Sequence, residues 1–459
     1  MSWRLLLIEA RRTPALWLVV PLVFLCFRTY GDRFTPHVPL WILTSVAIGQ
    51  AATIIGPPVA GIAAWIAGRE RRRGAQELLA TTSYSPVSRL LITWLATTGC
   101  GLLIYGLFAA GGGIVTARGA SWGGPDPWLI LAGAATIMAY CAIGFAIGVA
   151  LPYRFIAPLV ALGLLIGQEA ITIFSVVKPR FSAVQYLFPV ARDTVNVWYG
   201  SLPDNVPFRL LMYLALLGVV WAVLALRLAR FKSVKSWASL ALAILLLITG
   251  VAQALAHIPT PVNRLARFSG YGDSWYDTAE IRPYTLACSD APIQVCVHPA
   301  YQPWLGELST EVNTLLAPLV GLPGMPQRAE QVPPRGRRAD ATTPIVYIPF
   351  SLDHRNLYEA KRYAVDCAIF SCTADLEDIK FRDAVRPDAR AAIARWLRLR
   401  IGDTPEGPYS RSCFPQPGQD TFCLAAERFA ALDPATQRAW LEAHFADLRA
   451  GRVTLGEMP

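Results

Sequence analysis

The sequence has little charge for its length. Only 16% of its 459 residues are charged, whereas soluble domains contain about 25%; 54% are hydrophobic and the mean hydropathy is +0.38. Residues 1–257 hold 20 basic and 8 acidic side chains, and residues 258–459 hold 22 and 24, so their net charges are +12 and −2. This division excludes a single soluble domain, a disordered chain and a collagen-like fibre. The positive charges flank apolar runs, so no nucleic-acid partner is expected.

The sequence also lacks the common catalytic motifs. None of its five lysines follows a glycine, so the Gly-Lys-Ser/Thr element of a phosphate-binding loop is missing. Its five histidines include no His-Glu-x-x-His zinc pair, and no Gly-x-Ser-x-Gly elbow of a serine hydrolase occurs. We therefore expect a chain that is not an enzyme, binds no metal and has no cofactor of its own. A Ser/His/Asp set assembled from distant residues is the enzymatic alternative left open.

Long apolar runs dominate the first half. A helix of about 20 apolar residues crosses a bilayer. Seven such runs occur, at about 14–27, 34–68, 90–116, 128–151, 155–177, 210–226 and 237–257. The first is not expected to be a cleaved signal peptide, because Arg28 follows it directly without a small-residue cleavage site. The predicted fold class is an α-helical polytopic membrane protein.

The distribution of Lys and Arg between the loops predicts the orientation. Cytoplasmic loops of membrane proteins are richer in these residues than outer loops. With the N-terminus in the cytoplasm, the inner segments carry 13 Lys and Arg and the outer segments carry 7. Seven spans then place residues 258–459 outside the plasma membrane.

The nine cysteines support this orientation. Cys26, Cys100 and Cys141 lie in apolar runs. The other six lie in the second half: Cys288, Cys296, Cys367, Cys372, Cys413 and Cys423. An even set in an outward-facing domain indicates three disulfides, and the sequence leaves their pairing open. Six free thiols in a cytosolic domain are the alternative. A zinc site is disfavoured because no second pair accompanies Cys367 and Cys372.

The segment 69–89 is the most informative about function. It begins with a charged run that predicts a helix, continues with a short apolar stretch and ends in a polar stop. Its residues of note are Glu70, Gly74, Glu77, Leu78, Leu79, Pro86 and Arg89. A short cytoplasmic helix between two spans is well placed to bind a soluble partner, because charges set the register and leucines fill a groove. An ordinary positively charged loop is the alternative.

Residues 1–235 resemble the membrane subunit of an ABC-2-type ABC transporter. The resemblance rests on the residues just named, on an apolar and basic N-terminal segment (2–12) and on six of the apolar runs. The resemblance implies a permease core in membrane lipid that pairs with a second copy or a homologue. It implies cytoplasmic ATPase subunits that bind ATP and Mg²⁺ and contact 69–89 as the coupling helix. It also implies short re-entrant helices outside, at 178–207.

Polar residues inside the apolar runs are candidates for the transport pathway, because they are costly in a bilayer. Gln168 and Glu169 lie together in the fifth run, and Gln50 and Thr53 precede Pro57 in the second. A proline removes an intrahelical hydrogen bond, so we expect a break or kink at Pro57. Structural pairing and the kinks common to any bundle are the alternatives.

The remainder departs from the family's pattern, with a seventh span at 236–257 and an extracytoplasmic α+β domain at 258–459. Alternating or β-branched runs predict strands, and helical spacing of apolar residues predicts helices. We expect strands at 293–298 and 343–350, helices at 305–319, 388–399 and 433–451, and a loop at 323–341. An outer cap that gates or receives substrate is favoured over a peptidase and over a domain that binds an extracellular peptide or partner.

The expected function is that of a permease subunit of an ATP-driven exporter. Export rather than import follows from the resemblance alone, and the sequence does not identify the substrate. The alternative is a non-transporting membrane receptor or immunity-type protein whose outer domain binds an extracellular ligand.

Overall fold

The structure is a computed structural model of the whole chain. It describes residues 8–11, 13–34, 39–74, 86–177, 194–198, 200–202, 206–228, 234–256, 283–331, 345–348, 364–365, 368–369, 388–400 and 421–459. The chain divides into two compact units, Met1–Ile281 and Arg282–Pro459, and each is described by itself. The domain boundary predicted between residues 257 and 258 lies outside the described residues.

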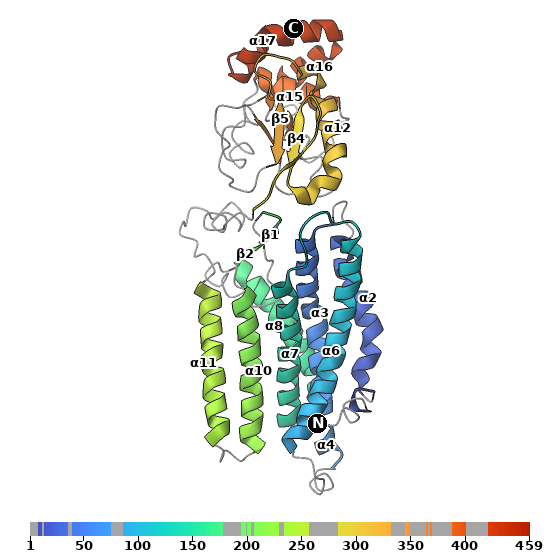
Figure 1. Cartoon of the computed structure of the whole chain (residues 1–459), viewed down its shortest axis with the longest axis vertical. Helices are drawn as coiled ribbons and strands as arrows, with labels where there is room; N and C mark the ends of the chain where they lie inside the picture. Colours follow the sequence, from blue (N-terminus) through green and yellow to red (C-terminus); the bar gives the residue numbers. More distant parts are fainter. Residues whose placement is uncertain are drawn as a thin grey trace. The chain divides into compact units, whose positions relative to one another are not determined.

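The N-terminal unit is a bundle of long apolar helices (Figure 1). Six described segments are long and apolar enough to cross a membrane: Pro14–Arg33, Trp41–Ala67, Val87–Ala117, Pro127–Ala150, Val206–Arg227 and Ser236–Ala256. They contain α2 (Val19–Tyr30) between the 3-10 turns η1 (Pro14–Leu18) and η2 (Gly31–Arg33), then α3 (Trp41–Ala67), α6 (Pro86–Ala117), α7 (Pro127–Ala150), α10 (Val206–Leu228) and α11 (Val234–Ala256). By length and composition, the chain is a helical multi-pass membrane protein.

The fifth predicted span corresponds to α8 (Ile156–Val177). The described apolar stretch of this helix, Ile156–Ile171, is shorter than the six segments above. A total of seven spans therefore stays a prediction.

Prolines lie inside one helix and at the start of another. α3 runs through Pro57 and Pro58, so the break expected there is wrong, while a kink stays a prediction. Pro86, predicted to stop the preceding segment, is the first residue of α6, and residues 75–85 before it lie outside the described residues. Proline is favoured in a first helical turn because the N–H that it lacks would have no intrahelical acceptor there.

α3 is the most buried of the six candidate spans, and it contacts α2, α6, α7 and α8. Its approach to α7 depends on glycine. A Cβ on Gly144 would lie 2.8 Å from the carbonyl carbon of Ala60, and one on Gly148 would lie 2.7 Å from the Cα of Ala64. Membrane helices associate through such close backbone contacts between small residues, because lipid supplies little hydrophobic drive. The α3–α7 contact is therefore the centre of this unit.

The described residues between α8 and α10 form a β-hairpin. β1 (Thr194–Asn196) pairs antiparallel with β2 (Gly200–Leu202), and Trp198 in the connection is buried. The re-entrant helices expected at 178–207 are therefore wrong for the described part of that range, which holds this hairpin and the start of α10.

The C-terminal unit contains a four-stranded sheet in the order β3-β4-β5-β6. Its strands are β3 (Ala287–Cys288), β4 (Gln294–Val297), β5 (Arg328–Gln331) and β6 (Ile345–Ile348). β3 is antiparallel to β4, whereas β4, β5 and β6 are parallel. The two predicted strands are confirmed as β4 and β6. The loop predicted at 323–341 is wrong, since it contains β5 in the middle of the sheet.

Helices complete this unit. They are α12 (Leu305–Leu316), α15 (Ala389–Leu399), α16 (Thr421–Ala431) and α17 (Pro434–Arg449), with 3-10 turns at η4 (Pro299–Trp304), η5 (Ala317–Leu319) and η7 (Leu455–Glu457). α12, α15 and α17 were predicted. Asp388 and Asp433 cap α15 and α17, because each carboxylate accepts hydrogen bonds from backbone N–H groups of the first turn. The described residues thus give this unit both helices and a sheet, as predicted.

Candidate functional site

Polar side chains from four parts of the bundle meet beside α3. Tyr30 of α2 donates to the Gln50 carbonyl at 3.3 Å and lies 3.4 Å from the Thr53 hydroxyl. Arg33 of η2 donates to the Gln50 side-chain oxygen at 3.0 Å. Gln168 of α8 belongs to the same group, because its side chain donates to the Thr53 carbonyl. We call these five residues, with Tyr140 of α7, the polar cluster. Three of the predicted pathway residues therefore lie in one hydrogen-bonded group.

Gln168 explains how α3 continues through Pro57. In a helix the Thr53 carbonyl would accept from the N–H four residues later, and Pro57 has none. The Gln168 side-chain nitrogen donates to the Thr53 carbonyl instead, at 3.1 Å, and its oxygen lies 3.4 Å from the Tyr140 hydroxyl. Gln168 is buried, with 4% of its surface exposed. A freed carbonyl inside a bundle is tolerated when a neighbouring helix supplies the donor in this way.

The polar cluster adjoins a small pocket through Gln50. The pocket has about 20 Å³ of room for water, enough for about one molecule. Its walls come from α3, α7 and α10, and Arg209 and Tyr213 are its α10 residues. In this conformation the pocket suits a bound water or a single small polar group, and it is too small for a transported substrate.

Arg209 is a site residue that the sequence reasoning missed. Arg209 is one of the seven Lys and Arg residues assigned by sequence to the outer segments, but it lies inside α10 and only 4% of its surface is exposed. A buried cation near the end of a membrane helix is costly and by default a functional candidate. Its place directly before an apolar run was the signal available in the sequence.

Glu169 points elsewhere. It is exposed on α8, one residue after the buried Gln168. It lies on a stripe of exposed residues that repeat every three or four positions: Phe155, Leu159, Leu162, Ile166, Glu169 and Ile173. The structure therefore separates the two adjacent pathway candidates onto different faces of one helix.

The described part of 69–89 is short and firmly attached to the bundle. α4 (Arg69–Arg72) follows α3 directly, and Gly74 ends the turn with φ +65°. Arg69 forms an ion pair with Glu9, which lies in the helical residues 8–11. The N-terminal segment and the predicted coupling segment are thus joined.

The other residues predicted for coupling are distributed as follows. Glu70 is half-buried on α4, while Pro86 and Arg89 lie in the first turn of α6. Glu77, Leu78 and Leu79 lie outside the described residues. A helix continuous over 69–89 is excluded by the positive φ at Gly74, which favours glycine and ends right-handed helices.

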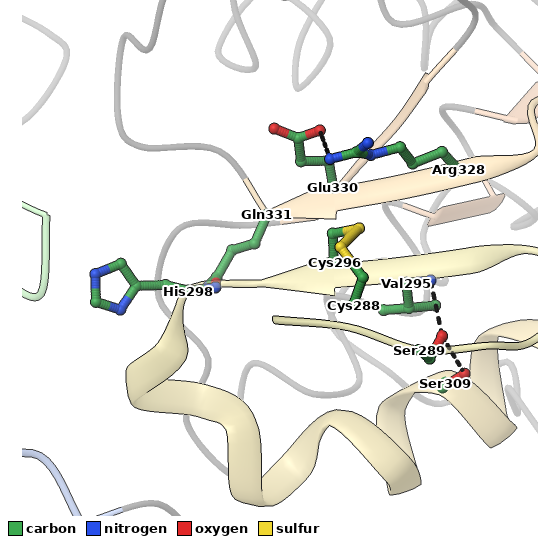
Figure 2. The surroundings of a disulfide bond; sticks show 9 residues. All are labelled: Cys288, Ser289, Val295, Cys296, His298, Ser309, Arg328, Glu330 and Gln331. Atoms are coloured by element: carbon green, nitrogen blue, oxygen red, sulfur yellow. Dashed lines mark hydrogen bonds and ion pairs between the residues drawn. A yellow bond between two sulfur atoms is a disulfide. The ribbon is translucent and has the colours of Figure 1, made fainter. Parts of the chain in front are cut away.

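The cysteines of the C-terminal unit include one described pair. Cys288 of β3 and Cys296 of β4 form a disulfide and also face each other in the strand register (Figure 2). The hydroxyl oxygen of Ser289, beside the disulfide, accepts a hydrogen bond from the Val295 N–H at 3.0 Å and another from the Ser309 hydroxyl at 2.9 Å. Cys423 is disulfide-bonded too. Cys367, Cys372 and Cys413 lie outside the described residues.

His298 at the end of β4 is buried, with 0% of its surface exposed. The ring Nδ1 accepts from the Ala300 N–H at 3.1 Å, and the backbone N–H of His298 donates to the Gln331 side-chain oxygen at 2.9 Å. Figure 2 shows the ring directed away from the disulfide. Burial lowers the pKa of this histidine from 6.5 to about 4, so it is neutral at pH 7.

Among the described residues, no group of three or more His, Cys, Asp or Glu side chains is arranged to hold a metal ion. No family model, curated protein or solved structure matches the chain.

Gln168→Leu tests the link between Gln168 and Pro57. The Thr53 carbonyl loses its donor, so we expect the stability of the purified protein in detergent to fall by about 1–2 kcal/mol. Pro57→Ala restores a backbone N–H that can donate to the same carbonyl. The double variant Pro57→Ala, Gln168→Leu should therefore recover about 1 kcal/mol relative to the sum of the single variants. If the stability change of the double variant equals the sum of the two single changes, the Thr53 carbonyl does not connect Gln168 with Pro57.

Proposed function

We propose that this chain is the permease subunit of an ATP-driven transporter of the ABC-2 type, and that it exports its substrate. It lies in the plasma membrane with its N-terminus in the cytoplasm and its C-terminal unit outside. Two permeases, either two copies or this chain and a homologue, form the pathway. Separate cytoplasmic ATPase subunits bind ATP and Mg²⁺ and supply the energy.

The attachment of α4 is the observation that carries this proposal. A coupling segment must transmit force from a soluble partner to the spans, so it needs rigid connections to several of them. Arg71 donates to the Val149 carbonyl near the end of α7 at 3.1 Å, and Arg72 donates to the Trp65 carbonyl of α3. With the Arg69–Glu9 ion pair, these bonds tie α4 to two spans and to the N-terminal segment.

The α8 stripe supports a second membrane subunit. It is apolar apart from Glu169, and a carboxylate facing lipid tails is costly. A second permease against this stripe would remove Glu169 from lipid and allow it to pair or to line a shared pathway. Gln168, on a buried face of the same helix, connects α8 to α3 through the Thr53 carbonyl.

The test is purification of the tagged full chain from its native membrane in mild detergent, with mass spectrometry of the proteins that accompany it. We expect a stoichiometric soluble ATPase that carries a Gly-Lys-Ser/Thr loop. Leu78→Asp should lower ATPase recovery about tenfold while leaving membrane insertion intact, because a charge replaces an apolar anchor of the interface.

Val234→Asp is the matched control. It makes the same kind of change at an exposed position that starts α11, on the same predicted side of the membrane. It should leave ATPase recovery unchanged. If no ATPase accompanies the chain even after cross-linking, or if both variants behave alike, the transporter proposal fails. A receptor or immunity-type protein then becomes the better explanation.

A further inference from the structure

Four arginines gather where α3 ends and α8 begins. Arg71, Arg72 and Arg73 follow one another at the end of α4, and Arg154 lies in the connection from α7 to α8. We call them the arginine patch. Burial first, and then Arg154 and Arg73, lower the pKa of Arg72, which places these like charges close together. Such a group requires negative charge nearby to be stable.

Backbone carbonyls at two helix ends accept hydrogen bonds from the arginine patch, but they occupy only some of its N–H donors. Arg71 and Arg72 each bond one carbonyl, at the C-terminal ends of α7 and α3, where the helix dipole attracts cations. A guanidinium has five N–H donors. Nη1 of Arg72 is buried and has no acceptor among the described residues. This nitrogen is packed against Gly68, so the donors that a ligand can reach are those of the exposed Arg71, Arg73 and Arg154.

No carboxylate shares an ion pair with the patch in the described part of the chain. The nearest described ion pair, between Glu9 and Arg69, leaves the four arginines out. The patch therefore combines clustered cations, open donors and no described counter-ion. This is the chemistry that binds a phosphate group.

Aromatic residues place the patch at the edge of the membrane. The Arg72 guanidinium lies 4.3 Å from the centre of the Trp65 ring, and 40% of Trp65 is exposed. Tyr153 and Phe155, on either side of Arg154, are 69% and 77% exposed. Trp and Tyr gather at the level of lipid headgroups. The exposed apolar stripe of α8 begins at Phe155 and offers a surface for acyl chains.

We propose that the arginine patch binds the headgroup phosphate of an anionic phospholipid, whose acyl chains lie against Phe155 and Leu159, at the end of the α8 stripe that is remote from Glu169. The bound lipid neutralises the patch and fixes the junction of α3, α4 and α8. The inference requires only that these helices cross a membrane, so it does not depend on the proposed transport function.

Native mass spectrometry of the full chain tests the site. The protein is released from detergent containing equal amounts of phosphatidylglycerol and phosphatidylcholine with the same acyl chains. We expect phosphatidylglycerol to be retained at least about fivefold better, and Arg72→Gln or Arg154→Gln to lower its retention about fivefold each. Arg154 is exposed, so its substitution should leave the fold intact and keeps the test valid if Arg72→Gln misfolds.

Arg227→Gln is the control, because it removes the same charge at an exposed position in the last turn of α10. It should leave retention of phosphatidylglycerol unchanged. Equal retention of the two lipids, or equal losses in all three variants, overturns the proposal. Displacement of the lipid by millimolar inorganic phosphate overturns it in favour of a free-anion site. Intact lipid retention with loss of a co-purifying soluble protein overturns it in favour of a protein-docking surface.

Discussion

Gly144→Val is expected to lower the stability of the purified protein by about 3 kcal/mol, or the melting temperature in detergent by roughly 10 °C. The added side chain would enter the space occupied by the Ala60 backbone of α3. Backbone cannot move aside as a flexible side chain can, so α3 and α7 must separate. Because van der Waals contact is the main attraction between helices in lipid, this separation removes much of the attraction between α3 and α7.

Gly106→Val is the matched control. Gly106 is an exposed glycine in the interior of α6, and a Cβ there would meet no atom within 4 Å. Loss of glycine in a helix interior generally favours the helix, so this variant should melt at the wild-type temperature or slightly above it. The argument about α3 and α7 is wrong if Gly144→Val and Gly106→Val melt together. Size-exclusion chromatography of the heated samples provides the measurement.

Acidification should destabilise the C-terminal unit through His298. Its pKa is about 4 when folded and 6.5 in the unfolded chain. Between these values the unfolded chain takes up a proton that the folded unit refuses, so the stability present at pH 7.5 is lost as the pH falls. The loss from this histidine should reach about 2 kcal/mol at pH 5. A proton on Nδ1 would also oppose the Ala300 N–H, donor against donor.

Pulse proteolysis in urea, applied to the full chain in detergent, measures this loss. His298→Asn keeps an acceptor for the Ala300 N–H but does not titrate, so its urea midpoint should change much less between pH 7.5 and pH 5. His444→Asn, on α17, is the control, and it should retain the pH dependence of the wild type. If the urea midpoint of the wild type is the same at both pH values, protonation of His298 does not destabilise the C-terminal unit.

The sequence predicted those parts of the fold that depend on local pattern. Apolar length located the six helices that are long enough to cross a membrane, and Asp433 followed by Pro434 located the start of α17. The cysteines of the second half were expected to form disulfides with the pairing left open, and one disulfide, between Cys288 and Cys296, is confirmed. Each of these signals is contained within a few residues or one helix.

The parts that the sequence missed depend on distant partners. β5 has the sequence Arg-Ala-Glu-Gln, which has little preference for strands, and it forms because β4 and β6 pair with it on both sides. The break expected at Pro57 does not occur, because Gln168, 115 residues after Thr53, supplies the missing donor. Arg209 was assigned to a loop because charge alone does not show that a helix begins before it. The polar cluster could be predicted as separate residues, but not as one group.

The disulfide at β3 also protects the domain from aggregation. β3 is only two residues long and forms the outer strand next to β4, whose Val295 and Val297 are buried. Hydrogen bonds over two residues hold an edge strand weakly, whereas the covalent bond between Cys288 and Cys296 prevents it from slipping or leaving. Without the bond, β4 would become an open, apolar edge on which a strand of another molecule can add. Oxidation of this one pair thus keeps β3 in place over the edge of β4.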